Sequence, residues 1–508
     1  ETVQQIWDNR GIRLDIENLP DPDPVTNELI RNGRTIACFQ IESPAMRTLL
    51  RNTQAGTTDM LIKTLSLVRP GPSGSGMKKR FIARHLGKEP TEYLYPSLER
   101  VLGDTYGVML YQEDILKVAN VIAGMDLAEG DMLRRAMTKD RSSREMAKLM
   151  KTFIEKAVAN GVEESVAGKI WERIANFAAY SYCKAHASTY GEISYQCAYL
   201  KAHFPTEFMA CVLSNRGGFY HPAVYVEEAR RLGIEVRPPD INKSRFEYAA
   251  EGDAIRVGFV EVRQLAQSTI DAIVAERAKR PFESLADAWA RTGMSNPEAD
   301  ALIRAGAFDV FNRTRPALFW ELHLLAQGRH EMEAADTNRL FREHGGEYRP
   351  VPRLPDISRK KRTDQEWEAL GLVVSTHPLE YYASLFQDRA LVSSIDLPCY
   401  VDRGVMLVGW LIAERRVGVK GRGCMKFCSF EDSYGVFEAV LFSETYQRYG
   451  RLLDSHGPYF VTGKVQNDDN YCSLLVEELE RVDALPTSPG ASDITPPKHW
   501  IFPEAQEG

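Results

Sequence analysis

The sequence predicts a multidomain α+β protein in which a mainly helical region precedes a small all-β domain. Two observations support this prediction. Between Leu29 and Leu213 apolar residues recur mostly at three- and four-residue spacing, which is the period of an amphipathic helix. From Gly404 to Arg481 apolar and polar residues alternate in short runs, which is typical of strands. The length of 508 residues agrees with this organisation, because it suffices for about three or four domains.

The helical period is clearest in three segments, Asp114–Met125, Ser143–Gly161 and Val166–Tyr180. Before them, Arg69–Gly76 (RPGPSGSG) cannot continue a helix, because proline breaks it and glycine loosens the backbone. This break is either a loop that approaches a phosphate or a base closely, or a plain connection between helices.

Two cationic clusters lie in apolar surroundings within the helical region. One is the pair Arg134 and Arg135, and the other is a short polar interruption that contains Lys184 and His186. Arginine offers a planar, permanently charged fork to phosphate oxygens, and lysine offers a mobile point charge. The two clusters therefore predict polyphosphate binding, and the alternative is that they lie on solvated helix faces.

The C-terminal alternating runs predict five strands with a helix between the third and the fourth, which is the pattern of an OB-fold. The strands expected are Val405–Ile412, Cys424–Phe430, Val436–Phe442, Tyr459–Val465 and Tyr471–Leu479, and the helix is Ser443–Leu453. Between the first two strands we expect a basic, glycine-rich loop, Arg415–Gly423, where OB-folds bind single strands. The candidate DNA contacts are Arg415, Arg416, Lys420, Arg422 and Phe427. The alternative is an ordinary charged hairpin tip.

The net charge of −7 does not exclude nucleic acid, because the charge is unevenly distributed. Between Lys63 and Lys151 there are 16 Lys/Arg and 11 Asp/Glu, a local excess of five positive charges. Such a basic region fits DNA binding through one face. No apolar run reaches the roughly 18–20 residues of a membrane helix, so we expect a cytoplasmic protein without membrane contact.

The eight cysteines are scattered, and Cys424 and Cys428 are the closest pair. In a strand, residues four apart are roughly 13 Å distant, which is too far to share one metal ion. We therefore expect free thiols in a reducing cytoplasm and no metal site.

Several longer motifs follow one another in a fixed order. They are Thr35–Leu49 (TIACFQIESPAMRTL), Leu67–Met77 (LVRPGPSGSGM), Tyr106–Asp114 (YGVMLYQED), Asp131–Met137 (DMLRRAM), Tyr182–Tyr190 (YCKAHASTY), Tyr199–Met209 (YLKAHFPTEFM) and Pro238–Asn242 (PPDIN). Weaker motifs follow at Leu302–Asp309 and Leu370–Leu379. In this order they resemble the C-family DNA polymerases, the bacterial DNA polymerase III alpha subunit and its error-prone relatives, over roughly Leu14 to Val482.

The resemblance implies that the helical region is a fingers domain, which closes over the incoming nucleotide. It places Arg134 and Arg135 against the triphosphate, and Lys184 and His186 near it or near the template. The nucleotide-binding candidates are therefore Arg134, Arg135, Lys184, His186, Arg69, Gln112 and Glu113. Tyr180, Tyr182 and Tyr190 could stack on bases, but aromatic residues at such spacing more often belong to a core.

A further implication concerns what the sequence lacks. The family carries catalytic aspartates on palm strands with Pro-Asp-Phe-Asp-like and Phe-Asp-Phe-like motifs, and neither occurs here. We therefore expect the C-terminal part of such a polymerase, from after the palm aspartates onward. Catalytic residues and the ligands of two Mg²⁺ ions would then lie elsewhere in the full-length enzyme. The only Asp-x-Asp, Asp21-Pro22-Asp23, is proline-flanked, so we expect Leu19–Val25 to be an exposed extended linker.

The family also has a helix-hairpin-helix module that binds the DNA backbone. At Gly258–Gln267 the hairpin glycines are replaced by Gln264 and Ala266, so we expect a retained fold with weakened DNA contact, although Arg263 remains. The later Ile303–Phe308, with Arg304, keeps one glycine and is the better-formed hairpin.

A sliding-clamp peptide is the last implied element. Glu331–Asp364 is polar and charged, which favours an exposed linker. Within it Leu340 and Phe341 match the end of a clamp peptide, without the usual initial glutamine. They could equally form one turn of a helix packed on the body.

The expected domains are 1–28, a remnant joining the missing palm; 29–215, the fingers; 216–330, a helix-hairpin-helix or clamp-binding-type domain; 331–395, a linker with a possible clamp peptide and a small helical segment; 396–483, the OB-fold; and 484–508, a Pro-rich tail.

The expected function is that of part of a DNA-directed DNA polymerase, a nucleotidyltransferase, in bacterial replication or error-prone repair synthesis. The chain alone is expected to be inactive. The expected partners are template-primer DNA, deoxynucleoside triphosphate, the sliding clamp and other replisome or mutasome subunits. The alternative is a non-catalytic DNA-binding and clamp-tethering protein derived from a polymerase.

Overall fold

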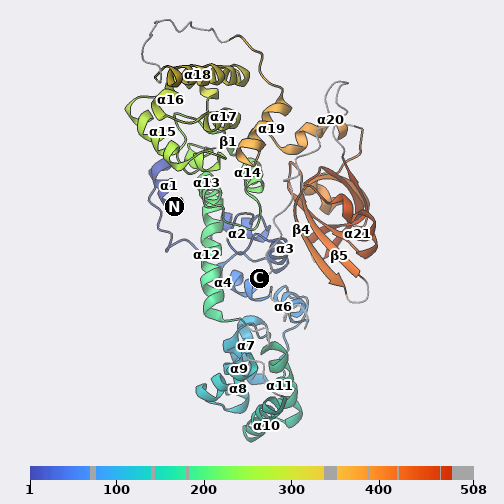
Figure 1. Ribbon diagram of the computed structural model, residues 1–508. Coiled ribbons are helices and arrows are strands. Elements are labelled where there is room, and N and C mark those ends of the chain that lie inside the picture. The colour runs from blue at the N-terminus through green and yellow to red at the C-terminus, as the bar shows by residue number, and fades with distance from the viewer. Residues whose placement is uncertain are drawn as a thin grey trace. The chain divides into compact units, whose positions relative to one another are not determined.

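The computed structural model describes residues 1–68, 76–138, 143–178, 182–336, 352–386, 388–419, 423–468 and 471–482 (Figure 1). The chain forms two compact units. The helical unit comprises Asp15–His203 with Asp469–Tyr471, and the mixed unit comprises Glu1–Leu14, Phe204–Asp468 and Cys472–Gly508. Arg69 to Ser75, Tyr180, Lys420 to Arg422, Leu340 and Phe341 lie outside the described residues.

The helical unit consists of successive short helices and one long one. They are α2 (Pro24–Arg31), α3 (Pro44–Thr53), α4 (Thr58–Ser66), α6 (Met77–His85), α7 (Glu99–Leu102), α8 (Gln112–Ala123), α9 (Leu127–Thr138), α10 (Ser143–Ala159), α11 (Glu164–Ala178) and α12 (Lys184–His203). The three helices expected from the apolar period correspond to α8, α10 and α11, so their prediction is confirmed.

Two cores hold these helices together. Helices α7 to α11 share a core that includes Ile115, Phe153 and Trp171. The long helix α12, green in Figure 1, packs on α4. Its buried residues include the small Ala187 and Gly191, and Ile62 of α4 lies against Gly191. The two helices therefore approach closely at Gly191, which positions the residues at the start of α12.

The expected linker Leu19–Val25 is exposed but anchored rather than free. Asp23 caps α2, since its Oδ2 accepts from the Thr26 N–H at 2.8 Å, and His203 Nε2 lies 2.8 Å from the same oxygen. Asp21 accepts a hydrogen bond from the Thr58 N–H at 3.0 Å. Both carboxylates therefore serve helix starts.

The mixed unit begins with helices around a three-stranded sheet of order β1-β3-β2. Its strands are β1 (Glu235–Arg237), β2 (Ala249–Glu251) and β3 (Ala254–Arg256). Its helices are α1 (Thr2–Arg10), α13 (Pro205–Asn215), α14 (Pro222–Arg231), α15 (Gln267–Lys279), α16 (Leu285–Thr292), α17 (Asn296–Ala305), α18 (Arg315–Asp336), α19 (Arg359–Leu370) and α20 (Ala383–Phe386).

The expected linker Glu331–Asp364 differs from the structure at both ends, where α18 continues to Asp336 and α19 begins at Arg359. The polar sequence concealed α19 because its buried side chains are hydrogen-bonded. Glu366 accepts from the N–H groups of Val374 and Ser375, at 3.0 and 2.9 Å. Between 352 and 364 only Thr363 is buried, so the expected exposure agrees with the structure there and the helical conformation from Arg359 is what the sequence missed.

The unit ends in a closed barrel of order β4-β5-β6-β8-β7. The elements are β4 (Gly404–Val419), β5 (Gly423–Glu431), β6 (Val436–Leu441), α21 (Ser443–Tyr449), β7 (Tyr459–Asp468) and β8 (Tyr471–Arg481). The predicted order of five strands with a helix after the third is confirmed. One detail is wrong: Arg415 and Arg416 belong to β4, because β4 and β5 pair as far as Val419 and Gly423.

In the described ranges no helix is both long and apolar enough to span a membrane.

Candidate nucleotide and nucleic-acid binding sites

The starts of α8 and α12 lie side by side in the helical unit. Tyr111 and Tyr182, which precede these helices, form an isolated parallel β-bridge, and the Gln112 N–H donates to the Tyr182 carbonyl at 2.8 Å. Asp114 fixes the start of α8 by accepting from the N–H groups of Leu110 and Tyr111, each at 2.9 Å. Two helix N-termini, each the positive end of its helix, therefore share one location.

Arg134 of α9 reaches this location. Its Nη1 donates to Gln112 Oε1 at 3.0 Å, while its Nε and Nη2 donate to Asp131 Oδ1 at 3.0 and 2.8 Å. Arg135 binds the other oxygen of the same carboxylate at 2.7 Å. The Arg134 hydrogen bond holds the pKa of Asp131 below its ordinary value. The Arg134 side chain is 26% exposed and that of Arg135 is 68% exposed, so Arg134 is the more firmly held.

Glu113 has a role that the sequence did not indicate. Its Oε2 accepts from the Lys184 N–H at 3.0 Å, which places it on the first turn of α12. The Lys184 side chain is exposed, and its Nζ lies 5.3 Å from the centre of the Tyr111 ring, within cation–π range. That Glu113 lines the nucleotide groove stays a prediction, and the structure adds that its carboxylate holds the backbone of Lys184.

His186 lies two residues after Lys184, still on the first turn of α12, and between two aromatic rings. Its ring centre is 5.4 Å from that of Tyr182 and 4.1 Å from that of Tyr190. A continuous set of contacts thus links six of the seven nucleotide-site candidates. Arg69, the seventh, lies outside the described residues. No sequence pattern could have shown these pairings, because they join segments 22 to 71 residues apart.

The two hairpin candidates make contacts within the chain. The Arg263 N–H donates to the Ala369 carbonyl at 2.8 Å, and its guanidinium lies against Gly371. Arg304 binds two carboxylates, those of Asp300 and Glu368, at 2.5 and 2.8 Å. Gln264, which replaces a hairpin glycine, has a φ of +64°, so it adopts the left-handed conformation that favours glycine. DNA contact by Arg263 or Arg304 stays a prediction.

The OB-barrel candidates divide between two faces. Arg415 pairs in register with Phe427, so the two side chains lie on one side of the strands. Phe427 is 38% exposed while its neighbour Cys428 is buried in the core, which shows that this side faces outward. Arg416 lies on the opposite side, where it donates to Cys424 Sγ at 3.3 Å. Only Arg415 and Phe427, of the described candidates, therefore share an outer face.

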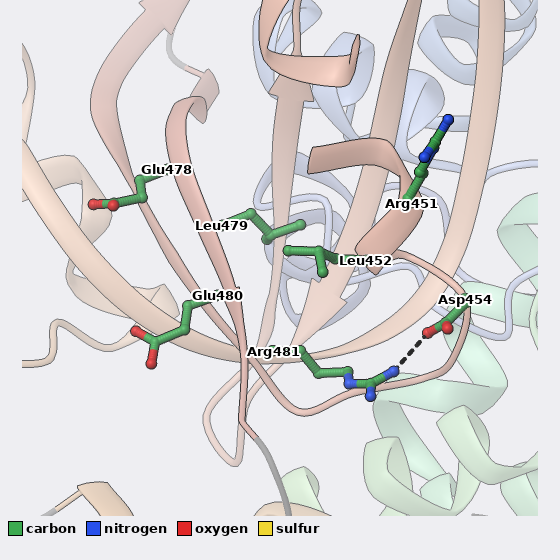
Figure 2. Close-up of a pocket in the computed structure, with 7 residues that line it drawn as sticks. All are labelled: Arg451, Leu452, Asp454, Glu478, Leu479, Glu480 and Arg481. Atoms are coloured by element: carbon green, nitrogen blue, oxygen red, sulfur yellow. Dashed lines mark hydrogen bonds and ion pairs between the residues drawn. The ribbon is translucent and has the colours of Figure 1, made fainter. Parts of the chain in front are cut away.

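A wide depression of about 560 Å³ lies elsewhere on the barrel, beside β8 (Figure 2). Its lining consists of Arg451, Leu452, Asp454, Glu478, Leu479, Glu480 and Arg481. Leu452 and Leu479 face each other in Figure 2, and Arg481 Nη1 lies 2.9 Å from Asp454 Oδ1. Sequence reasoning did not identify it, and its mixed charges favour no particular ligand.

Sequence reasoning also missed a buried ionic cluster in the mixed unit. Arg231 binds Glu228 at 3.0 Å and Glu431 at 3.4 Å. Burial raises the pKa of Glu431 to about 8 and that of Glu227 to about 7. Arg231 of α14 and Glu431 of β5 are 200 residues apart in the sequence, so no local sequence pattern could have predicted their ion pair. Within the described ranges no three His, Cys, Asp or Glu side chains cluster to hold a metal ion.

Three family models match this chain. Residues 1–161 match the bacterial DNA polymerase III alpha subunit finger domain, residues 233–318 a helix-hairpin-helix motif, and residues 405–482 an OB-fold nucleic acid binding domain. Gln112, Glu113, Arg134 and Arg135 fall in the first matched range, whereas Lys184 and His186 lie beyond its end at residue 161. Arg415 and Phe427 fall in the third matched range.

Similar curated proteins carry related names. An error-prone DNA polymerase of Symbiobacterium thermophilum is 32% identical over 92% of this chain and 47% of its own length. The DNA polymerase III alpha subunits of Aquifex aeolicus and Thermus aquaticus are 34% and 33% identical, over 91% and 96% of this chain and 39% and 41% of their own length. The chain spans less than half the length of these relatives.

Among solved structures, an asparaginyl-tRNA synthetase from Pyrococcus horikoshii matches 23% of this chain and 26% of its own at 22% identity. The TM-score of 0.17 is too low to support any argument.

Proposed function

We propose that this chain is part of a C-family DNA-directed DNA polymerase and that it binds the incoming nucleotide and the template-primer. The matched finger, hairpin and OB-fold models, together with relatives named DNA polymerase III subunit alpha and error-prone DNA polymerase, support the family. The observation that carries the nucleotide site is the meeting of Gln112, Arg134 and Lys184 at two adjacent helix starts.

The chemistry of the site fits a triphosphate. Arg134 presents a planar fork, Lys184 a point charge, and the helix starts add the positive ends of their dipoles. In the proposed reaction the primer 3′-hydroxyl oxygen bonds to the α-phosphorus while the bond to pyrophosphate breaks. Arg134 and Arg135 would stabilise the negative charge that develops on the leaving pyrophosphate, an electrostatic contribution.

The metal ions and carboxylates that catalyse nucleotidyl transfer are assigned to the complete polymerase. Mg²⁺, when bound by the complete polymerase, would neutralise phosphate charge and activate the attacking hydroxyl. We assign none of its ligands to the described residues of this chain. The sliding clamp and other subunits remain proposed partners, and no described residue is assigned to their binding.

On the barrel, Arg415 and Phe427 would bind a DNA strand together. A cation beside an exposed ring suits a phosphate and a stacked base, and such contacts tolerate any sequence. The choice between replication and error-prone repair stays open, since relatives of both names match similarly.

Nucleotide binding by this chain, measured by equilibrium dialysis, tests the proposal. Arg134→Ala should weaken binding about 10-fold or more, because a hydrogen bond to a charged group contributes roughly 1.5–3 kcal/mol. Arg135→Ala should weaken it less, because that side chain is mostly exposed. Arg245→Ala, which lies in the mixed unit, serves as the control. Unchanged binding in both single variants and in the double variant would contradict the assignment.

A gel shift on primer-template DNA at two salt concentrations completes the test. Binding that weakens steeply with salt is expected for contacts to phosphates. Primer extension by the same chain would instead show that its own carboxylates hold the catalytic metal ions.

A further inference from the structure

Four aromatic rings form a row along one side of the helical unit. Tyr182, His186 and Tyr190 follow one another at four-residue spacing, so they lie on one face of α12 and the turn before it. The row continues to Phe39, whose ring centre is 5.3 Å from that of Tyr190, edge to face. We call this set the ring row.

Phe39 is the exposed end of the ring row. It is 40% exposed, whereas its neighbours Cys38 and Ile41 are fully buried. One exposed apolar residue is ordinary in itself. What distinguishes Phe39 is the backbone that carries it.

The turn that presents Phe39 contains two strained residues. Ala37 has a φ of +72° and Gln40 a φ of +62°, conformations that residues with a Cβ rarely adopt. Strain of this kind persists only where surrounding structure imposes it, and it gathers at functional sites. Burial of Cys38 and Ile41 would also be possible with the Phe39 ring packed inward, so its outward position is a separate feature of this turn.

Three buried side chains impose this conformation. Lys201, only 1% exposed, donates from its Nζ to the carbonyls of Arg34 and Ile36, both at 2.8 Å. Ser194 Oγ donates to the Phe39 carbonyl at 2.9 Å, and Glu42 accepts from the Ala37 N–H at 3.0 Å. The turn is therefore anchored to α12 by Lys201 and Ser194 and to its own following residue Glu42, which holds the backbone that carries Phe39.

The ring row starts at the cationic site. Lys184 opens α12, and Tyr190 lies six residues later, about 9 Å along the helix axis at 1.5 Å per residue. A nucleotide likewise carries its charge at one end and a flat base at the other. Aromatic rings stack on bases of any sequence, because every base has a π-face.

We propose that Phe39, supported by Tyr190, is a stacking platform for a nucleobase in the complex with nucleotide and template-primer. This inference rests on the proposed nucleotide site and adds the surface that receives the base. The strained turn fixes the height and tilt of the ring, so the platform exists before the ligand arrives. Pre-organisation of this kind lowers the entropy lost on binding.

The test uses bases that report stacking by their fluorescence. The full chain is titrated with 2-aminopurine deoxynucleoside triphosphate, and separately with a primer-template that carries 2-aminopurine at the templating position. Phe39→Ala should weaken one of the two on the order of 5- to 150-fold, the range of base–aromatic stacking. Which one weakens identifies the base that occupies the platform. Phe39→Trp, which keeps a stacking ring, should restore binding.

The matched control is Phe246→Ala, since Phe246 is also 40% exposed but lies in the mixed unit. Inorganic tripolyphosphate distinguishes the charge site at Arg134 from the stacking platform at Phe39, because it carries the phosphate charge but no base. Its binding should weaken in Arg134→Ala and stay unchanged in Phe39→Ala. If Phe39→Ala and Phe246→Ala bind both base probes equally well, the platform is refuted while the charge site stands. If the unmodified chain binds neither triphosphate nor tripolyphosphate, both proposals fail.

Discussion

The close packing of α12 on α4 makes Gly191 a sharp place to test how the candidate site is positioned. A Cβ added at Gly191 would lie 2.4 Å from Ile62 Cγ1 and 3.3 Å from Ile62 N. Distances under 3.0 Å are essentially never found for real Cβ atoms. Ile62 Cγ1 is attached directly to the β-carbon of a helical residue and has little freedom to move away, and the Ile62 backbone is also close. We therefore expect Gly191→Ala to push the two helices apart.

The expected net effect is destabilising. Overpacking of a core costs about 1–3 kcal/mol, and replacing a helical glycine with alanine returns up to about 1 kcal/mol. Gly191→Ala should therefore weaken the α4–α12 contact by about 1–2 kcal/mol. Gly168→Ala on α11 is the matched control, because nothing lies within 4 Å of its added Cβ. The control should stabilise its helix by up to about 1 kcal/mol.

Hydrogen–deuterium exchange with mass spectrometry measures this locally, which suits a chain of two units. Amides of α4 and α12 should lose protection about 5- to 30-fold in Gly191→Ala, whereas those of α11 should keep or gain protection in Gly168→Ala. Equal or greater protection of α4 and α12 in Gly191→Ala would refute the reasoning that close approach requires glycine there.

Three further outcomes follow from described contacts. Glu113→Ala should lower the hydrogen-exchange protection of the first turn of α12 about 5-fold, because losing a helix cap costs about 1 kcal/mol. Unchanged exchange in that turn would contradict the role of Glu113 as the cap. Arg415→Ala and Phe427→Ala should each weaken single-strand binding in a gel shift, and Arg415→Ala should also reduce the salt dependence by about one phosphate contact. Arg416→Ala, on the opposite side of the strands, should weaken single-strand binding less. Equal losses of binding in all three variants would contradict the assignment of faces. The thermal midpoint of the mixed unit should fall as pH rises from about 5 to 8, because burial raises the pKa of Glu431 from 4.5 to about 8 and that of Glu227 to about 7. The folded chain therefore keeps protons that the unfolded chain has released. Glu431→Gln should reduce this dependence and leave the part due to Glu227, and a curve parallel to that of the unmodified chain would count against it.

The sequence predicted those parts of the fold that local pattern determines. The helices α8, α10 and α11 and the five barrel strands follow from period alone, because each buries one face along its own length. The end of β4 was misjudged since Gly418 and Arg415 read as loop residues. Pairing with β5 overrides that local preference, and pairing is a tertiary contact.

The sequence predicted the cationic residues of the candidate nucleotide site but not the contacts that position them. Residue types and motif resemblance selected Arg134 and Lys184, but the partners that fix them, Gln112 and Glu113, were selected without their roles. Phe39 lies within the motif Thr35–Leu49, but the sequence did not predict its exposure, because nothing local shows that its turn is strained. Arg304 was selected for its charge, and two carboxylates that neutralise it became apparent only in the structure.

Closure of the barrel through its last strand has a consequence for how the chain tolerates shortening. In the ring β4-β5-β6-β8-β7, strand β8 joins β6 to β7, and of the strands in the described ranges it comes last in the sequence. A chain cut before Tyr471 would therefore leave two open edges with unpaired N–H and C=O groups. Such edges recruit strands from other molecules. We expect that losing β8 would open the barrel and promote its aggregation, while the helical unit kept its helices.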